Sequence, residues 1–416
     1  MKKTLVISNA CFSEKGANGR TLKNLFGKTD ADKLAQFFIY GIPDFDVCRK
    51  YYQVSDKNAL KAILPFVKLD GNIEKAPSIE DDNRDVTTEE RIVRKTPLKV
   101  LLRETVWLLS GWENAYFRKW LESFKPEAIC LFIANNIFLI RLAIRIAKKY
   151  QIPIFVYTTE AYNFMDFNYL TNCPSVTYKI YFMWLRSAYK KITPYVQCGF
   201  FNNTLLRDAY QKEYGYPCHC IMNCSEIQCL PRYEVCSYKD MKVAYLGNLG
   251  LGRHKALIEM AEILQEIDKE LYLDVYGSAS DENMRRELDD ACGVKFHGFV
   301  CYEQVVEIIH NSHLLVHVEL NDEIVNRDLK YAFSTKIADC LCSGTPLLMY
   351  ASDTLAETIF LKENECAFVA NSKEQLKKVL EQALTDEDAR KQIVDNACRT
   401  KNNVLTGNDM LIQMLS

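Results

Sequence analysis

Short apolar runs alternate with amphipathic stretches along most of the chain, and this alternation predicts strands and helices in turn. In the first half, five apolar runs bounded by turn residues predict strands: 4–8, 34–40, 128–134, 154–158 and 195–198. Uniformly apolar runs of this length are typical of strands buried on both faces of a parallel sheet. Helical periodicity lies between several of these runs, most clearly over residues 137–149.

The second half repeats the rhythm more clearly. Its predicted strands are 242–246, 272–276, 294–297, 314–318, 346–349 and 367–369, and its predicted helices are 256–267, 302–311, 336–342 and 374–383. Alternation of strand and helix over two halves predicts two doubly wound, Rossmann-like α/β domains. The turn-rich stretch 215–239 marks the boundary. We therefore expect a first domain over 1–225, a second over 226–395, and a C-terminal helix over 396–416 that packs back on the first domain.

An insertion at about 70–125 departs from this rhythm. Residues 70–90 hold eight acidic against two basic residues, which predicts a mobile loop. Residues 91–125 then hold eight basic residues together with Trp107, Trp112 and Trp120, and residues 175–207 hold five basic residues and no acid. Basic residues beside Trp, Tyr and Leu suit a helix on an anionic membrane surface. A helix pair whose apolar face is core needs the same amphipathicity, so both interpretations stand.

Composition narrows the class of protein. The 416 residues are 48% hydrophobic and 25% charged, with 52 Lys and Arg against 54 Asp and Glu. A net charge of −2 gives no reason to expect a nucleic-acid partner. We find no secretory signal and no apolar run long enough to span a membrane, so we expect a cytoplasmic protein, with peripheral contact to the inner face of the cytoplasmic membrane as a further hypothesis.

The chain has no pattern that predicts a metal site. Its 16 cysteines should be reduced thiols, and the group at 218, 220, 224 and 229 lacks the C-x-x-C spacing of structural zinc. Asp44 and Asp46 resemble the D-x-D of metal-dependent sugar transferases, but they follow Pro43 and favour a solvated turn. We expect neither a metal nor another cofactor.

The segment 331–346, Y-A-F-S-T-K-I-A-D-C-L-C-S-G-T-P, is the most informative chemically. Ser334 or Thr335 can cap a helix on which Lys336 and Asp339 share a face. A helix N-terminus with hydroxyls and a lysine suits a phosphate, and a carboxylate one turn deeper suits ribose hydroxyls. An ordinary capped helix in an α/β domain would look the same.

Two glycine-rich loops add to this segment. The first, 247–255, follows a predicted strand, and its Arg253 can fork onto a diphosphate. Its glycines are not spaced as G-x-G-x-x-G, and a lone glycine-rich loop is a weak indication. The second, 16–21, follows the first predicted strand.

Together these motifs resemble the nucleotide-sugar glycosyltransferases of the GT-B fold, especially the retaining group called family 4. The resemblance is strongest from about 242 to 369. It implies two domains that face a cleft, with a UDP-sugar or GDP-sugar donor bound to the second domain and no metal requirement. The implied acceptor is a saccharide or a lipid-linked saccharide of cell-surface polysaccharide synthesis. The implied donor-binding residues are Gly16, Asn18, Gly19, Gly247, Asn248, Gly277, Phe299, Val300, Ser334, Thr335 and Asp339.

The chain departs from the family pattern at two positions. Tyr331 stands where the family has the first of two glutamates, and Asn248 stands where it has an arginine. We expect Lys336 and Arg253 to stabilise the leaving phosphate as catalytic groups, both facing a solvated cleft. If the enzyme inverts configuration, Glu160 is the candidate base, although an acid at a helix start is the simpler interpretation.

Two other functions remain open from the sequence. A nucleotide-sugar epimerase of the same fold would need further acid and base groups in the cleft. All six histidines lie between His219 and His317, which weakens that alternative. A non-catalytic nucleotide-sugar-binding protein would not need Ser334, Thr335, Lys336 and Asp339 together.

Overall fold

The chain forms two compact units in this computed structural model, which describes residues 1–13, 17–64, 66–74, 96–165, 175–222, 225, 227–404 and 409–416. The first unit comprises Met1–Met222 with Gly407–Ser416, and the second comprises Asn223–Thr406. The domain boundary expected at 395–396 falls inside helix α16 (Glu387–Asn403), so of the expected C-terminal helix only the last ten residues belong to the first unit. Most of the acidic stretch 70–90 lies outside the described residues.

The first unit is built on an eight-stranded sheet with the order β4-β3-β2-β1-β5-β6-β7-β8. The strands are β1 Thr4–Ile7, β2 Leu34–Phe38, β3 Lys50–Gln53, β4 Asn72–Ile73, β5 Ala128–Phe132, β6 Ile154–Thr158, β7 Val196–Phe201 and β8 Cys218–Cys220. All neighbours are parallel except β4, which runs antiparallel to β3. Every residue of β1, β2 and β6 is buried, as expected for strands covered on both faces.

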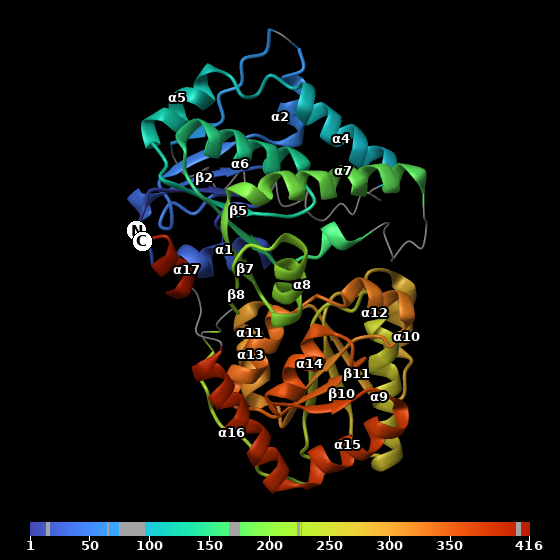
Figure 1. Cartoon of the computed structure of the whole chain (residues 1–416). Helices are drawn as coiled ribbons and strands as arrows, with labels where there is room; N and C mark the ends of the chain where they lie inside the picture. Colours follow the sequence, from blue (N-terminus) through green and yellow to red (C-terminus); the bar gives the residue numbers. More distant parts are fainter. Residues whose placement is uncertain are drawn as a thin grey trace. The chain divides into compact units, whose positions relative to one another are not determined.

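Helices cover both faces of this sheet. They are α1 Ala17–Phe26, α2 Asp56–Lys61, α4 Pro97–Leu109, α5 Ala115–Phe124, α6 Ile137–Tyr150, α7 Val176–Ile192, α8 Thr204–Tyr214 and α17 Asp409–Met414. Figure 1 shows α4, α5, α6 and α7 on one side of the sheet and α1 and α17 on the other. The C-terminus is tied to β1, because the Lys2 N–H donates to the Leu415 carbonyl at 2.6 Å and Leu411 and Leu415 pack into the core.

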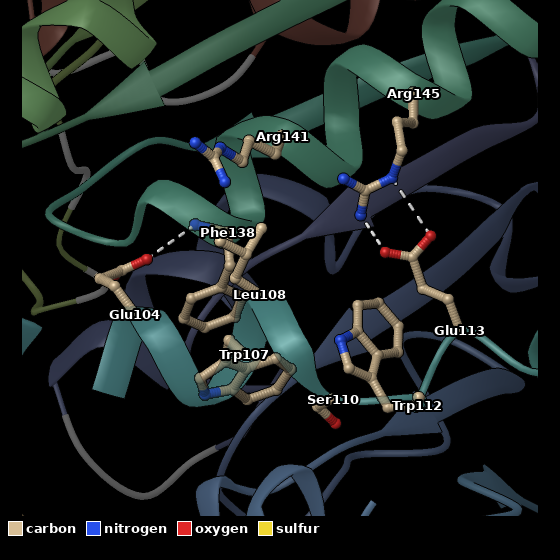
Figure 2. A pocket seen from close by; sticks show the side chains of 10 residues that line it. Glu104, Trp107, Leu108, Ser110, Trp112, Glu113, Phe138, Arg141 and Arg145 are labelled. Carbon is tan, nitrogen blue, oxygen red and sulfur yellow. Dashed lines mark hydrogen bonds and ion pairs between the residues drawn. The ribbon is translucent and has the colours of Figure 1, made fainter. Parts of the chain in front are cut away.

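The tryptophans of the basic stretch belong to the core. Trp107, Trp112 and Trp120 are all buried. The Trp107 ring contacts Phe138 (Figure 2), and the rings of Trp112 and Trp120 both contact Phe117. Tryptophans at a membrane surface would remain exposed at one end. The interpretation that these three rings lie on lipid is therefore wrong, because they fill the space between α4, α5, α6 and the sheet.

The second unit has a six-stranded parallel sheet with the order β11-β10-β9-β12-β13-β14. Its strands are β9 Val243–Leu246, β10 Leu273–Tyr276, β11 Val294–Gly298, β12 Leu314–Val318, β13 Leu347–Tyr350 and β14 Phe368–Ala370. Its helices are α9 Arg253–Ile267, α10 Glu282–Asp289, α11 Tyr302–Asn311, α12 Glu323–Leu329, α13 Thr335–Ser343, α14 Ala356–Glu363, α15 Lys373–Thr385 and α16. The fold class expected from the sequence, two parallel α/β units, is confirmed.

The sequence pattern missed the short strands β3, β4 and β8, of which β4 and β8 form the two edges of the sheet. β3 (K-Y-Y-Q) is buried only at its two tyrosines, and β8 has three residues inside the stretch that predicts turns. Such strands form because a neighbour offers unpaired backbone groups, as β2 does for β3 and β7 for β8. The hydrophobic pattern of a segment does not show whether a neighbouring strand has unpaired backbone groups.

Candidate active site

The site lies where the chain reverses its direction through the second sheet. From β9 the chain builds outward to β10 and β11, then returns to place β12 on the other side of β9. In open α/β sheets, ligands bind at such a switch point, outside the carboxyl ends of the strands. The loop after β9 and the residues after β12 therefore form the expected binding edge.

Close backbone approach shapes the loop after β9. A Cβ atom at Gly247 would lie 2.6 Å from the Tyr245 hydroxyl and 2.8 Å from Lys336 Nζ. A Cβ at Gly277 would lie 2.1 Å from the Gly247 carbonyl oxygen. Asn248 closes the loop on itself, because its Oδ1 accepts the Gly250 N–H at 2.7 Å. Gly247 and Gly277 are thus required for packing at this edge, and Asn248 is a loop-forming residue.

Lys336 presents the cation closest to this loop. It is the second residue of α13, half-buried, and its Nζ lies against Gly247. In the part of the chain that the structure describes, this ammonium has no hydrogen-bond or ion-pair partner. Burial, followed by the charge of Arg253, lowers the pKa of Lys336 below its ordinary value. An unpaired cation beside a glycine loop and a helix N-terminus is suited to an anion such as a phosphate.

Arg253 is placed differently from the sequence expectation. Its guanidinium donates to Glu319 Oε1 from Nε at 2.9 Å and from Nη2 at 2.6 Å. Its side chain is 14% exposed and that of Glu319 only 1%. The expectation of a solvated Arg253 is wrong, because α9 begins next to the end of β12 and turns the guanidinium onto Glu319. Arg253 lies at the predicted edge, but as one half of a buried ion pair.

A buried charge cluster extends from this ion pair. His317 Nε2 lies 3.0 Å from Glu357 Oε2, at the start of α14, and 3.8 Å from Glu319 Oε1. The sequence analysis missed Glu319 and Glu357. An available indication for Glu319 was its position directly after the buried strand β12, where parallel strands place functional groups. Glu357 carries no comparable local signal.

This cluster holds residue types that can bind a metal ion. Among the described residues, His317, Glu319 and Glu357 are the group whose ligand atoms approach within 4.8 Å of one another. Arg253 already binds Glu319, and Lys336 lies beside Arg253. A divalent cation there would meet two like charges in a buried region, which costs free energy. The donor set is suitable by type, and Arg253 already neutralises one of its two carboxylates, that of Glu319.

Asp339 lies one turn into α13, half-buried, and accepts a hydrogen bond from the Ser225 hydroxyl at 2.6 Å. The N-cap residue of the same helix, Ser334, makes no side-chain capping bond, and Thr335 is exposed. The first turn of α13 therefore keeps N–H groups and hydroxyls that a ligand can use. Lys336 and Asp339 lie on one helix as predicted.

The loop after β11 supplies an exposed aromatic ring. Gly298 has φ +76° and makes the turn, and its carbonyl accepts the Gly277 N–H at 2.8 Å. Phe299 is 78% exposed and Val300 half-buried. The structure thus places Gly277, Phe299 and Val300 on neighbouring loops at one edge of the sheet.

The predicted residues of the first unit form no shared site among the described residues. Glu160 is exposed just after β6, and its backbone carbonyl accepts the Tyr210 hydroxyl at 3.2 Å. Asn18 is exposed in the first turn of α1, whereas Gly19 is buried because a Cβ there would lie 3.0 Å from Ser13 Cβ. Gly16 lies outside the described residues.

The chain resembles known proteins in sequence over its second unit and in fold over its whole length. Residues 238–400 match the family described as Glycosyl transferases group 1. The solved structure of HepE from Anabaena with UDP and glucose is 12% identical, with a TM-score of 0.55 over 100% of this chain and 99% of that chain. WaaG, a glycosyltransferase involved in lipopolysaccharide biosynthesis, is 12% identical, with a TM-score of 0.56 over 99% of both chains. The lipopolysaccharide outer core galactosyltransferase WaaB is 12% identical, with a TM-score of 0.57 over 97% of this chain and 96% of that chain. Comparison with curated protein sequences gives no match.

The fold is the GT-B fold that these glycosyltransferase structures share. The family match lies in the second unit, whose residues 238–400 are similar to the glycosyl transferases group 1. The resemblance drawn from the sequence motifs is confirmed.

Proposed function

We propose that this enzyme moves a sugar from a nucleoside-diphosphate sugar to a saccharide or lipid-linked acceptor in cell-surface polysaccharide synthesis. The observation that supports this most directly is Lys336, whose unpaired ammonium lies against Gly247 at the switch point of the second sheet. A cation held half-buried without a partner destabilises the fold unless a ligand uses it. The diphosphate of the donor is the ligand that fits this charge.

The chemistry follows from the leaving group. Breaking the anomeric bond builds negative charge on the β-phosphate and positive character on the sugar ring. Lys336 and the N–H groups of α13 are aimed at that phosphate, while Arg253, held by Glu319, adds positive potential from behind. Fixed charges in a partly dehydrated site stabilise such a transition state without reorganisation.

The same charges support a metal-independent reaction. Metal-dependent transferases use a divalent cation to neutralise the leaving diphosphate. In this scheme Lys336 and the N–H groups of α13 take that role, and Arg253 is paired with Glu319. No cofactor is required by this scheme.

We further propose retention of configuration. In that mode the departing phosphate accepts the proton of the acceptor hydroxyl, so no separate base is needed. Tyr331, in the position of the family's first glutamate, leaves the contacts to the sugar ring to other groups. In an inverting reaction the exposed carboxylate of Glu160 would be the base.

The names of similar structures support the substrate classes. HepE was solved with UDP and glucose, and WaaB and WaaG act in lipopolysaccharide synthesis. These observations favour a UDP-sugar over a GDP-sugar and a cell-surface glycan as the acceptor class. Asp339, with its acceptor oxygens on α13, is the proposed ribose ligand.

Peripheral membrane contact belongs to the proposal through α4 and α7, which pack against each other. One stripe of α4 exposes Leu98, Leu102 and Leu109, and one stripe of α7 exposes Val176, Ile180 and Met183. Lys99, Lys179, Lys190 and Lys191 are exposed on the same helices. Exposed leucines beside lysines suit an anionic lipid surface. Within the described residues, none of the helices is long and apolar enough to cross a bilayer.

One experiment tests the function directly. The purified chain is incubated with radiolabelled UDP-sugars and GDP-sugars and a lipopolysaccharide or polyprenyl-linked acceptor extract, and transfer, hydrolysis and epimerisation are scored separately. We expect transfer and slow hydrolysis, both reduced in Lys336→Ala. Epimerisation without transfer would replace the proposal by the epimerase alternative. Nucleotide binding with no turnover of any kind would indicate a binding protein.

A further inference from the structure

Two thiols of the second unit lie close together, near the places where the chain enters and leaves that unit. Cys229 Sγ is 3.2 Å from Cys398 Sγ, although the two residues are 169 positions apart. The second unit comprises Asn223–Thr406, so Cys229 follows the entry of the chain and Cys398 precedes its exit. A disulfide bond is about 2.05 Å long, so the two sulfurs need to approach each other by roughly 1 Å to form one.

The segment that carries Cys229 is held against the end of α13. The N–H groups of Leu230 and Arg232 donate to the carbonyls of Ser343 and Gly344, at 2.8 Å and 2.9 Å. A Cβ atom at Gly344 would lie 2.7 Å from the carbonyl carbon of Leu230, so the two backbones are in close contact. The position of the Cys229 backbone is therefore set by α13.

Helix α16, which carries Cys398, is attached to the same segment. Arg390 is fully buried, and its Nε donates to the Tyr233 carbonyl at 2.7 Å. Lys401 Nζ lies 3.5 Å from the Ile227 carbonyl oxygen. These contacts lie before and after each of the two cysteines along the chain, so both backbones are fixed around the thiols. A disulfide that needs little backbone movement forms with little strain.

The two thiols differ in how readily they ionise. Burial, followed by its hydrogen bond to Cys229, raises the pKa of Cys398 to about 12. A thiol that donates to a neighbouring sulfur stays protonated and stabilises the thiolate of that neighbour. Both cysteines are half-buried, so part of each remains accessible to a small reagent. Cys229 is therefore suited to be the attacking sulfur and Cys398 the resolving sulfur.

We propose that Cys229 and Cys398 form a reversible disulfide that closes the second unit at the two ends of its chain. The oxidant is a small disulfide, RSSR, of the class of oxidised glutathione. The Cys229 thiolate attacks one sulfur of RSSR and releases RS⁻, and the Cys398 sulfur, after losing its proton, displaces the second RS⁻ from Cys229. The two protein thiols give up two electrons and two protons, and one RSSR becomes two RSH.

This bond should stabilise the second unit. It would join residues 169 positions apart, and a cross-link over a long loop restricts the unfolded chain more than the folded one. For a unit of this size, the stabilisation typical of a disulfide corresponds to a rise in melting temperature of about 4–16 °C.

Oxidation of the full chain with glutathione tests the proposal. The protein is reduced, freed of reductant and incubated with oxidised glutathione, and the linked peptides are identified by mass spectrometry of a non-reduced digest. Peptide mapping is needed because the chain has 16 cysteines. We expect a Cys229–Cys398 link and a rise in melting temperature of about 4–16 °C, both reversed by dithiothreitol.

Three single variants assign the roles of the sulfurs. Cys398→Ser removes the resolving sulfur, so Cys229 should accumulate as a mixed disulfide with glutathione. Cys229→Ser removes the attacking sulfur, so Cys398 should react with glutathione more slowly than Cys229 does in the first variant. Cys236 is half-buried and follows Cys229 on the same segment, so Cys236→Ser is the matched control and should form the link as the wild type does.

The results on the wild type decide the proposal even if a variant folds poorly. Absence of the Cys229–Cys398 link, or a link that forms only in denaturant, overturns it. A link that leaves the melting temperature unchanged or lowers it overturns the stabilising closure of the second unit. Faster reaction at Cys398 in Cys229→Ser than at Cys229 in Cys398→Ser overturns the assignment of the attacking sulfur.

Discussion

Separate replacement of Arg253 and Lys336 should affect different properties of the proposed donor site: Arg253 mainly the stability of the fold, and Lys336 mainly the rate of transfer. Both residues supply positive charge to one edge of the second sheet, but only Arg253 is part of a buried ion pair, with Glu319. Removing it leaves the Glu319 carboxyl, which is 1% exposed, without its main partner. Breaking one partner out of a buried pair typically costs about 3–5 kcal/mol.

This cost converts to a measurable shift in melting temperature. The second unit spans 223–406, which is 406 − 223 + 1 = 184 residues. For domains of that size, each kcal/mol shifts Tm by about 2–4 °C. Arg253→Ala should therefore lower the melting temperature of this unit by roughly 6–20 °C. Lys336→Ala breaks no pair, and burial already disfavours its charge, so its Tm should stay within about 4 °C of the wild type.

Activity should follow a different order. Lys336→Ala should lower the rate of transfer by about 10²–10³-fold at a temperature where both proteins are folded, as for other groups that stabilise a developing oxyanion. The assays are differential scanning calorimetry and initial rates with a radiolabelled donor. The double variant Arg253→Met/Glu319→Leu removes both buried charges and should regain stability without regaining activity.

Two results would refute this reasoning. If Arg253→Ala melts within about 2 °C of the wild type, the Arg253–Glu319 pair contributes no more than an exposed one. If Lys336→Ala retains the full rate, or loses it only by melting, Lys336 is a structural residue and the phosphate site lies elsewhere.

Three further predictions test other parts of the molecule. Burial raises the pKa of Glu104 from 4.5 to about 7, so between these pH values the carboxyl is protonated in the folded protein and ionised in the unfolded one. The free energy of unfolding should therefore fall by roughly 3 kcal/mol as pH rises from about 4.5 to about 7. Urea unfolding should show this pH dependence in the wild type, and an equal dependence in Glu104→Gln would refute the raised pKa. Asp339→Asn should weaken UDP binding in calorimetry more than it lowers the maximal rate, because ribose contacts are alike in ground and transition states; the reverse order would contradict a ribose role. The chain should co-sediment with phosphatidylglycerol vesicles and detach as salt rises, and the double variant Leu98→Ser/Leu102→Ser should bind these vesicles less. If as much protein sediments with neutral vesicles, charge-dependent membrane binding is excluded.

The sequence by itself determined the architecture and the edge of the second sheet at which the glycine loop and Lys336 lie. Uniform apolar runs followed by amphipathic stretches are properties of the chain read locally, and parallel sheets covered on both faces require them. The glycines after β9 and the S-T-K start of α13 were also visible, because close backbone approach and helix starts need particular residue types. Lys336 and Gly247 consequently meet as the motifs imply.

Only the tertiary structure decided which charged groups are paired and which aromatic rings are buried. Arg253 and Glu319 lie 66 positions apart, and neither local pattern indicates that one neutralises the other. Trp107 and Leu98 share one amphipathic helix, yet the indole is buried and the leucine is exposed, because α2, α6 and α7 pack against α4 and cover only part of it. Periodicity specifies that a helix has an apolar face, but the pairing of charges and the covering of that face depend on which elements the fold places against it.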